Sequence, residues 1–251
     1  MRSIVFIALF YSWTTLAGVF ALPLLLSPPR GLLAFSRFWA RVSLWLLRIT
    51  VGLTHEIRGH ENIPVGPVLF AVKHQSAWET LVINLIIPDA AIVLKRELTR
   101  IPLFGWCLMR SRHIPIDRAG GMSALRTMVS AARARIAEGR PLVIFPEGTR
   151  VPPGSSAPYH AGIAALQGAI DVPVVPVALN SGLFWPWRSM ALRGGRITLE
   201  FLPALPRELK RREFIDNLEK SIENASNRLL DEAIAEHGLP RPEQPVDKSV
   251  E

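Results

Sequence analysis

The segment Val68-Leu-Phe-Ala-Val-Lys-His-Gln-Ser-Ala-Trp-Glu-Thr80 changes from one structural pattern to another within a few residues. Its first part, residues 68–72, is a short continuous apolar run of the kind typical of a buried strand. Polar residues then interrupt the run, and residues 77–87 favour a helix that ends before Pro88. The segment therefore predicts a strand–turn–helix unit.

The same alternation continues toward the C-terminus. Further strands are predicted at residues 90–94, 113–117, 142–145 and 174–179, and helices at residues 123–138, 162–169 and 212–237. The alternating residues 197–202 predict an edge strand. This order predicts an α/β fold with a mixed or parallel central sheet flanked by helices. We interpret residues 51–237 as one domain, and the Pro-rich, polar residues 238–251 as a disordered tail.

The N-terminal segment is apolar and free of charge between Arg2 and Arg30. As a helix, residues 3–26 are long enough to cross a hydrocarbon core of about 30 Å. A cleaved signal peptide is the alternative, but the apolar run is long and no small-residue cleavage site follows it. We therefore expect this segment to stay attached to a membrane.

A second N-terminal segment, residues 31–49, interleaves apolar residues with arginines. Arg37, Arg41 and Arg48 are spaced so that they share one helical face, as in a helix lying in the membrane interface. Prolines 28 and 29 separate this helix from the first. Residues 1–50 are thus interpreted as membrane-anchoring helices, which either span the bilayer or form a shallow hairpin. More arginines follow the apolar run than precede it, so the remainder is expected on the cytoplasmic face of the inner membrane.

Composition and charge narrow the class of protein. The chain has 251 residues, of which 49% are hydrophobic and 20% are charged, which excludes a disordered chain. Its net charge of +8 favours anionic partners, and the basic residues beside an apolar span suit lipid better than nucleic acid. The single cysteine, Cys107, excludes an intrachain disulfide. Nucleotide-phosphate loops and the GxSxG motif do not occur, and the spacing of His55 and His60 does not suit zinc.

One histidine and one glutamate follow the strand of residues 68–72. If His74 lies in the turn, its ring can fold back toward Glu79 in the next helix. The carboxylate would then hold Nδ1–H and free Nε2 to act as a general base. The nucleophile would be a hydroxyl group of the substrate, since no serine completes a triad. A histidine in a surface loop is the simpler alternative for this pair alone.

Three further segments place polar or basic residues at strand ends. Residues 145–150 (Phe-Pro-Glu-Gly-Thr-Arg) offer a glutamate to a hydroxyl and an arginine fork to a phosphate, although an ordinary turn is an alternative. Residues 112–118 and Lys95 add cations, for which solvated surface is the alternative. Residues 172–180 are most simply a core strand whose end lines the site.

Together and in this order, the HQS-xx-E, IPIDR, FPEGTR and VPVVPVALNSG segments resemble the glycerolipid acyltransferase family, specifically the 1-acylglycerol-3-phosphate acyltransferases. The resemblance covers residues 60–190. It implies transfer of a fatty acyl group from acyl-CoA or acyl carrier protein to the sn-2 hydroxyl of 1-acyl-sn-glycerol 3-phosphate, a lysophospholipid, giving phosphatidic acid. No cofactor and no metal are implied. Residues 51–237 then form the acyltransferase catalytic domain.

The resemblance also implies roles for individual residues. His74 matches the catalytic base and Glu79 its carboxylate, although the family's usual pattern is His-x4-Asp. The acceptor is expected to be bound by residues of the EGTR motif and two cations, namely Glu147, Gly148, Thr149, Arg150, Arg118 and Lys95. The stretch after the motif lacks basic residues that many relatives carry, and His160 stands in their place. Another lysolipid acceptor, such as lyso-ornithine lipid, and a non-catalytic lipid-binding protein remain alternatives.

Overall fold

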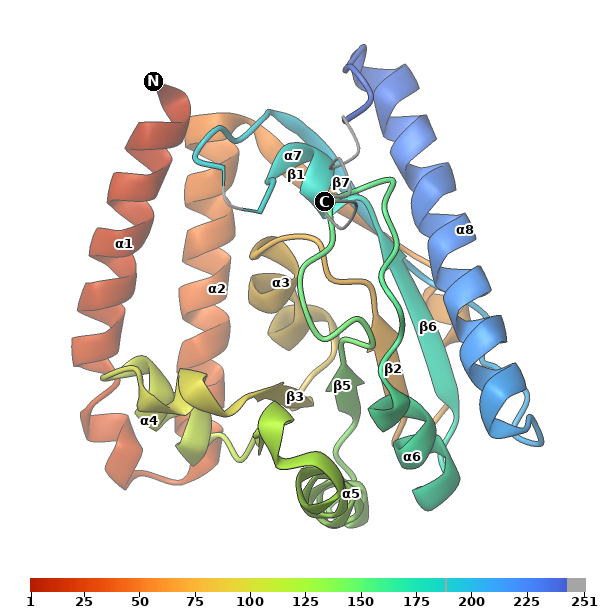
Figure 1. Ribbon diagram of the computed structural model, residues 1–251. Coiled ribbons are helices and arrows are strands. Elements are labelled where there is room, and N and C mark those ends of the chain that lie inside the picture. The colour runs from red at the N-terminus through yellow and green to blue at the C-terminus, as the bar shows by residue number, and fades with distance from the viewer. Residues whose placement is uncertain (188, 243–251) are drawn as a thin grey trace, which may run out of the picture.

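A seven-stranded mixed sheet forms the centre of the molecule, whose computed structural model describes residues 1–187 and 189–242 (Figure 1). The strands are β1 (Leu53–Arg58), β2 (Leu69–Val72), β3 (Ala91–Lys95), β4 (Ile114–Ile116), β5 (Leu142–Ile144), β6 (Val174–Leu179) and β7 (Gly195–Phe201). Their order is β1-β7-β6-β2-β5-β3-β4. Strands β6, β2, β5, β3 and β4 are parallel, whereas β7 is antiparallel to β6 and parallel to β1. The predicted α/β fold with a mixed sheet is confirmed.

Helices cover both faces of this sheet. They are α1 (Arg2–Phe20), α2 (Pro29–Val51), α3 (Trp78–Ile86), α4 (Phe104–Arg110), α5 (Gly121–Ala137), α6 (Ala161–Ala169), α7 (Ser181–Phe184) and α8 (Arg211–His237). Among the described residues, four 3-10 turns accompany them, η1 (Pro23–Leu26), η2 (His60–Asn62), η3 (Arg96–Arg100) and η4 (Arg118–Gly120). In β2, Phe70 and Val72 join a core with α2 and α3, whereas Leu69 and Ala71 join a core with α5, α6 and α8. Burial on both faces explains the continuous apolar run.

The prediction that residues 197–202 form an edge strand is wrong. Strand β7 lies between β6 and β1, and β1 forms the edge. The register pairs Leu53 with Gly195 and Arg58 with Glu200. The more polar β1 therefore shields β7, whose alternating sequence arises from residues that alternate between the two faces of an interior strand.

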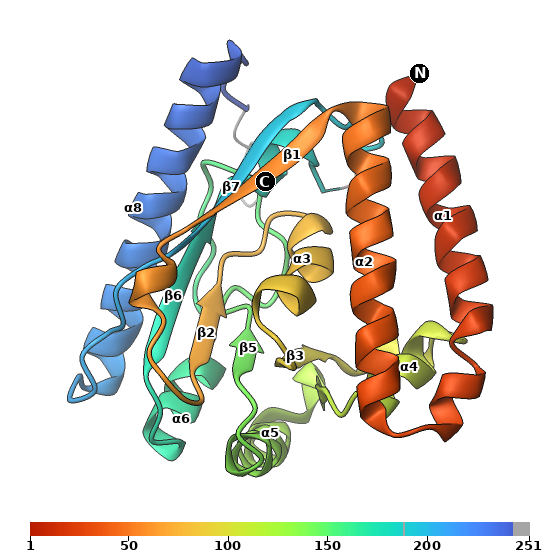
Figure 2. The ribbon, with the colours of Figure 1, turned by 180° about the vertical axis from the view of Figure 1, so that it is seen from behind.

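The N-terminal helices pack against the domain rather than standing apart from it. Figures 1 and 2 show α1 and α2 side by side on the flank opposite α8. The side chain of Phe6 is fully buried in the main core, and the Trp13 indole donates to the backbone oxygen of Trp39 at 3.2 Å. Pro29 begins α2. Within the described residues, α1 is the one helix that is long and apolar enough to cross a membrane.

The C-terminal tail lies mostly outside the described residues. Helix α8 ends at His237, and Gly238 follows with a left-handed backbone conformation. The predicted disordered tail covers residues 238–251, of which residues 243–251 lie outside the described part of the chain.

Candidate active site

The turn after β2 carries His74. Lys73 N–H still donates to Val177 O at 2.9 Å, in register with the sheet, and α3 begins only at Trp78. His74 therefore lies before the helix and Glu79 lies in its first turn. Nδ1 of His74 is 2.8 Å from Oε1 of Glu79. The turn thus brings together two side chains that a continuous helix would place on different faces.

The carboxylate of Glu79 is fully buried and accepts hydrogen bonds from several donors. Its Oε1 accepts from the N–H groups of Gln75 and Ser76, both at 2.7 Å. Its Oε2 accepts from the hydroxyls of Ser76 and Ser181, both at 2.9 Å. Burial opposes ionisation, but the hydrogen bonds from His74 and the backbone outweigh burial and lower the pKa of Glu79. The ionised carboxylate keeps the proton of His74 on Nδ1.

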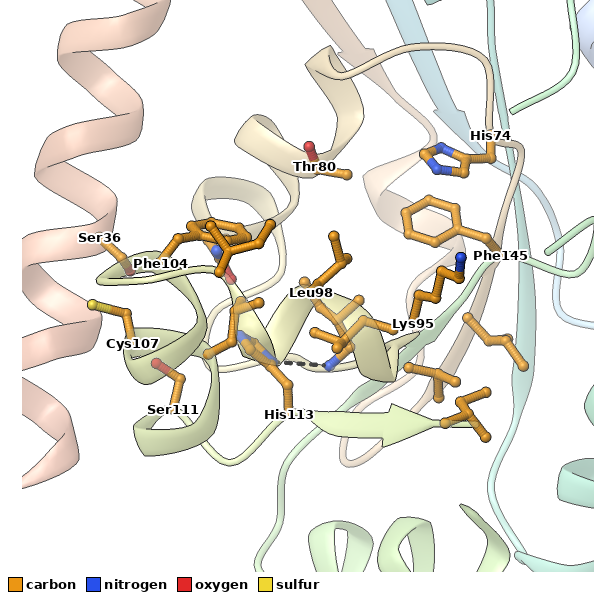
Figure 3. Close-up of a pocket in the computed structure, with 18 of the residues that line it drawn as sticks. Ser36, His74, Thr80, Lys95, Leu98, Phe104, Cys107, Ser111, His113 and Phe145 are labelled. Carbon is orange, nitrogen blue, oxygen red and sulfur yellow. Dashed lines mark hydrogen bonds between the residues drawn. The ribbon is translucent and has the colours of Figure 1, made fainter. Parts of the chain in front are cut away.

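The ring of His74 is held on a second side by an aromatic contact. The Phe145 ring stacks on the imidazole with centroids 4.1 Å apart and an angle of 24° between the planes (Figure 3). Nε2 makes no hydrogen bond within the described part of the chain, and His74 lines a cavity. An ordered imidazole with a free Nε2 facing a cavity can accept a proton from a bound molecule.

The cavity has a volume of about 900 Å³ and extends from His74 to the N-terminal helices. Figure 3 shows His74, Phe145 and Lys95 on one side of it and Ser36, Phe104 and Cys107 on the other. Its α1, α2 and α4 walls are largely apolar, whereas the cations Lys95, Arg118 and Arg150 line the cavity together with His74. This gradient suits an amphiphile whose polar end reaches the histidine.

Most of the predicted binding residues line this cavity together with His74. They are Lys95, Arg118, Gly148, Thr149 and Arg150. Gly148 has a φ of +66°, and a Cβ there would lie 2.6 Å from the imidazole of His160 and 3.8 Å from the guanidinium carbon of Arg118. Glycine is therefore required by backbone conformation and by space. Arg150 lines the cavity, and its buried Nε has no hydrogen-bond partner among the described residues.

Glu147 differs from the rest of its motif because it does not line the cavity. Its side chain is fully buried, and its Oε2 accepts from the N–H of His74 at 2.8 Å. Its Oε1 lies 2.6 Å from Nζ of Lys73. Burial raises the pKa of Glu147 to about 7, although the ammonium of Lys73 acts in the opposite direction. Glu147 therefore contacts the backbone of His74 and does not face the cavity.

Comparison with known proteins identifies the family. The family model described as acyltransferase matches residues 54–180, just over half of the chain. This chain belongs to the acyltransferase family. A Pseudomonas aeruginosa protein named 1-acyl-sn-glycerol-3-phosphate acyltransferase is 38% identical over 170 residues, 68% of this chain and 66% of that protein. A Cocos nucifera protein of the same name is 29% identical over 163 residues, 64% of this chain and 51% of that protein.

The chain therefore spans about half to two thirds of the length of these relatives. A solved structure, that of the 1-acyl-sn-glycerophosphate acyltransferase PlsC from Thermotoga maritima, superposes with a TM-score of 0.75 at 21% identity. It covers 91% of this chain and 98% of that one, and it shows that the acyltransferase fold extends beyond the matched segment. The family predicted from the four sequence motifs is confirmed.

Several residues of this acyltransferase-family site were not singled out in the sequence. Ser76 and Ser181 bind the carboxylate of Glu79, and only Ser76 lies close to it in sequence. Lys73 precedes the histidine directly, but nothing in the sequence indicates its ion pair with Glu223, 150 residues away. Such a contact depends on how α8 packs on the sheet.

Proposed function

We propose that this chain transfers a fatty acyl group from acyl-CoA or acyl carrier protein to the sn-2 hydroxyl of 1-acyl-sn-glycerol 3-phosphate, giving phosphatidic acid. The observation that carries the proposal is the His74–Glu79 pair, whose Nδ1–Oε1 distance is 2.8 Å while Nε2 faces the cavity. The names of the relatives support the same reaction.

In this reaction His74 is the general base. Its Nε2 removes the proton of the acceptor hydroxyl, and the oxygen attacks the thioester carbonyl as the C–S bond breaks. Glu79 stabilises the imidazolium that forms and keeps the ring oriented. The departing thiolate takes the proton back from Nε2, so a free thiol leaves and His74 is restored. No acyl-enzyme is needed.

The cations at the cavity are proposed to bind the phosphate of the acceptor. The guanidinium carbon of Arg118 lies 3.8 Å from the position of a Cβ on Gly148, and Arg150 and Lys95 line the same cavity. Guanidinium groups offer paired donors that match phosphate oxygens. Glycine at position 148 leaves room for the imidazole of His160, which lines the same cavity. Thr149, an exposed residue, adds a hydroxyl at the cavity.

The N-terminal helices are proposed to attach the protein to the cytoplasmic face of the inner membrane. Exposed apolar side chains on α1 include Leu9, Leu16 and Phe20. Helix α2 lies alongside α1 and carries the exposed Arg41 and Arg48, and an arginine at the bilayer centre costs on the order of 3 kcal/mol. A shallow hairpin in the interface avoids this cost. It would place the cavity where lysolipids reside.

A thiol-release assay tests the proposal directly. Purified protein is given acyl-CoA or acyl carrier protein thioester together with lysophosphatidic acid or an amine-bearing lysolipid. We expect release of thiol with lysophosphatidic acid and a loss of at least 100-fold in kcat for His74→Ala, at an unchanged fold by circular dichroism. Near-normal turnover of His74→Ala would refute the mechanism. Transfer only to the amine-bearing lysolipid would show that this lipid, and not lysophosphatidic acid, is the acceptor.

A further inference from the structure

A buried charged cluster lies behind the turn that carries His74. It is formed by four side chains from separate segments, namely Lys73, Glu147, Tyr159 and Glu223. The exposed fraction of the side chain is 1% for Lys73, 0% for Glu147 and 14% for Glu223. Among the described residues that line the cavity, none of the four occurs. A substrate in the cavity would therefore not contact them.

The ammonium of Lys73 makes contacts in three directions. It lies 2.6 Å from Oε1 of Glu147, and it donates to both carboxylate oxygens of Glu223, at 2.7 and 2.8 Å. It also donates to the backbone oxygen of Ser155 at 3.2 Å. The hydroxyl of Tyr159 donates to Oε1 of Glu223 at 3.0 Å. The cluster thus joins the end of β2, the loop after β5 and helix α8.

One contact connects this cluster to the histidine. Oε2 of Glu147 accepts from the backbone N–H of His74 at 2.8 Å, while its other oxygen faces Lys73. Phe145, two residues earlier, stacks on the imidazole ring. The same short loop therefore holds both the backbone and the ring of His74, and Lys73 with Glu223 fixes that loop.

Stability alone is a poor explanation for such a cluster. Removing an ammonium and two carboxylates from water is unfavourable, and well-packed apolar side chains are often at least as stabilising. What directional ion pairs provide is a defined position for the groups they join. Here the defined position is that of the proposed base.

We propose that Lys73, Glu147 and Glu223 are positioning residues that hold the backbone of His74, so that helix α8 takes part in setting the geometry of the reaction. This inference rests on the proposed function of His74. It assigns Glu147 to the support of the base, in place of the acceptor-binding role implied by the resemblance. In this assignment the acceptor is bound by Lys95, Arg118 and Arg150, which line the cavity.

Glu223→Gln tests the inference, because it keeps the shape of a partly exposed side chain and removes its charge. Misplacement of a reacting group by about 1 Å costs up to roughly 100-fold in rate. We therefore expect kcat to fall about tenfold or more while the KM values for donor and acceptor change less than about twofold. Tyr159→Phe removes one hydrogen bond to Glu223 and should give a smaller loss of kcat.

Glu232→Gln is the matched control. It makes the same chemical change on α8 and removes ion pairs with Arg58 and Arg228, but it does not touch the cluster. Its kcat should equal that of the unaltered protein. A kcat of Glu223→Gln equal to that of the control would overturn the inference, as would a rise in the KM of the acceptor at constant kcat in Glu147→Gln.

A second background separates this inference from the proposed function. In His74→Ala, adding Glu223→Gln should cause no further loss of turnover, because the positioned group is gone. An additional loss would show that Glu223 acts elsewhere and overturn the inference alone. If His74→Ala itself keeps normal turnover, the proposed function fails and the positioning role fails with it.

Discussion

Glu79 occupies the position at which the family's usual pattern has aspartate. Its contacts explain how the turn accommodates the extra methylene group of glutamate. Its oxygens bind two backbone N–H groups, two hydroxyls and Nδ1 of His74, all at 2.7–2.9 Å. The distances are those of ordinary hydrogen bonds. The local backbone is therefore matched to glutamate, and the non-catalytic alternative loses its only support in the sequence, which was this substitution.

Substitution of Glu79 separates the effect of its charge from that of its length. Glu79→Gln keeps the length but removes the charge that stabilises the imidazolium, so kcat should fall on the order of 100-fold or more. Glu79→Asp keeps the charge but withdraws the oxygens, so a loss of about tenfold is expected. Both are measured in the thiol-release assay, with Glu61→Gln in the exposed turn η2 as control. A Gln variant as active as this control would contradict the role of Glu79.

Arg150 provides the corresponding test of phosphate binding. Arg150→Ala removes a guanidinium group that lines the cavity, so the KM of lysophosphatidic acid should rise by about tenfold or more, as expected for a charged hydrogen bond. The KM of the acyl donor should change little. Arg126→Ala, an exposed arginine that does not line this cavity, is the control. An unchanged KM of the acceptor would remove Arg150 from the phosphate site.

The pKa shifts of two buried glutamates predict opposite effects of pH on stability. Glu147 binds its proton more tightly when folded, with a pKa of about 7 compared with 4.5, so its contribution to stability is lost as pH rises across that range. Glu79 has a lowered pKa, so its contribution is lost as pH falls below 4.5. Between pH 4.5 and pH 7, the unfolding free energy of Glu147→Gln should therefore decline less than that of the unaltered protein. Identical slopes for the two proteins would contradict this.

Sequence could predict the pair of His74 and Glu79 because both belong to one short turn. Motif matching also located the residue at position 147, but it could not show which way the side chain points. The direction follows from Lys73, whose buried ammonium attracts the carboxylate away from the cavity. Glu223 could not be predicted, because on an amphipathic helix a glutamate beside buried Ile222 is ordinarily a solvent-facing residue.

At the scale of elements, strands with continuous apolar sequences were predictable and short irregular segments were not. The cores of β2 and β6 coincide with the predicted strands, since all their residues are buried. The segment η3–α4, residues 96–110, has neither clear period nor a capping side chain, and its shape depends on packing against η1. That segment forms a wall of the cavity. The sequence alone did not predict that this segment lines the cavity.

Helix α1 offers a test of membrane attachment. Leu9 and Leu16 are exposed by 42% and 54%, and a spacing of seven places them on the same face. Changing both to glutamate should weaken binding to phospholipid vesicles by roughly tenfold or more, because an acidic side chain in hydrocarbon costs on the order of 2–3 kcal/mol. Val65→Glu, at an exposed apolar residue before β2, is the control in vesicle sedimentation. Equal sedimentation of all three proteins would exclude α1 from the membrane contact.

At the scale of the whole molecule, the proposed membrane contact and the cavity share the same elements. Helices α1 and α2 lie on the flank of the domain and also line the apolar end of the cavity, whose other end holds His74. In the proposed membrane-bound state, this arrangement would let an acyl chain enter the cavity from the lipid side. Because the core joins Phe6 of α1 to the sheet, the proposed docking of the helices on lipid would also fix the distance of His74 from the membrane.

The charge of the molecule predicts how this docking depends on salt. Residues 1–50 contain five arginines and no acidic residue, out of a net charge of +8 for the chain. Each cation near an anionic surface contributes about 1 kcal/mol, which is screened as the Debye length falls from about 10 Å at 0.1 M to about 3 Å at 1 M salt. Binding should therefore be tighter to vesicles that contain phosphatidylglycerol than to phosphatidylcholine alone, and the difference should shrink at high salt. Replacing the exposed Arg41 and Arg48 with glutamine should reduce that difference, whereas replacing Arg126 and Arg133 on α5 should leave it unchanged. Equal binding to both vesicles at low salt would show that apolar burial alone holds the protein at the bilayer.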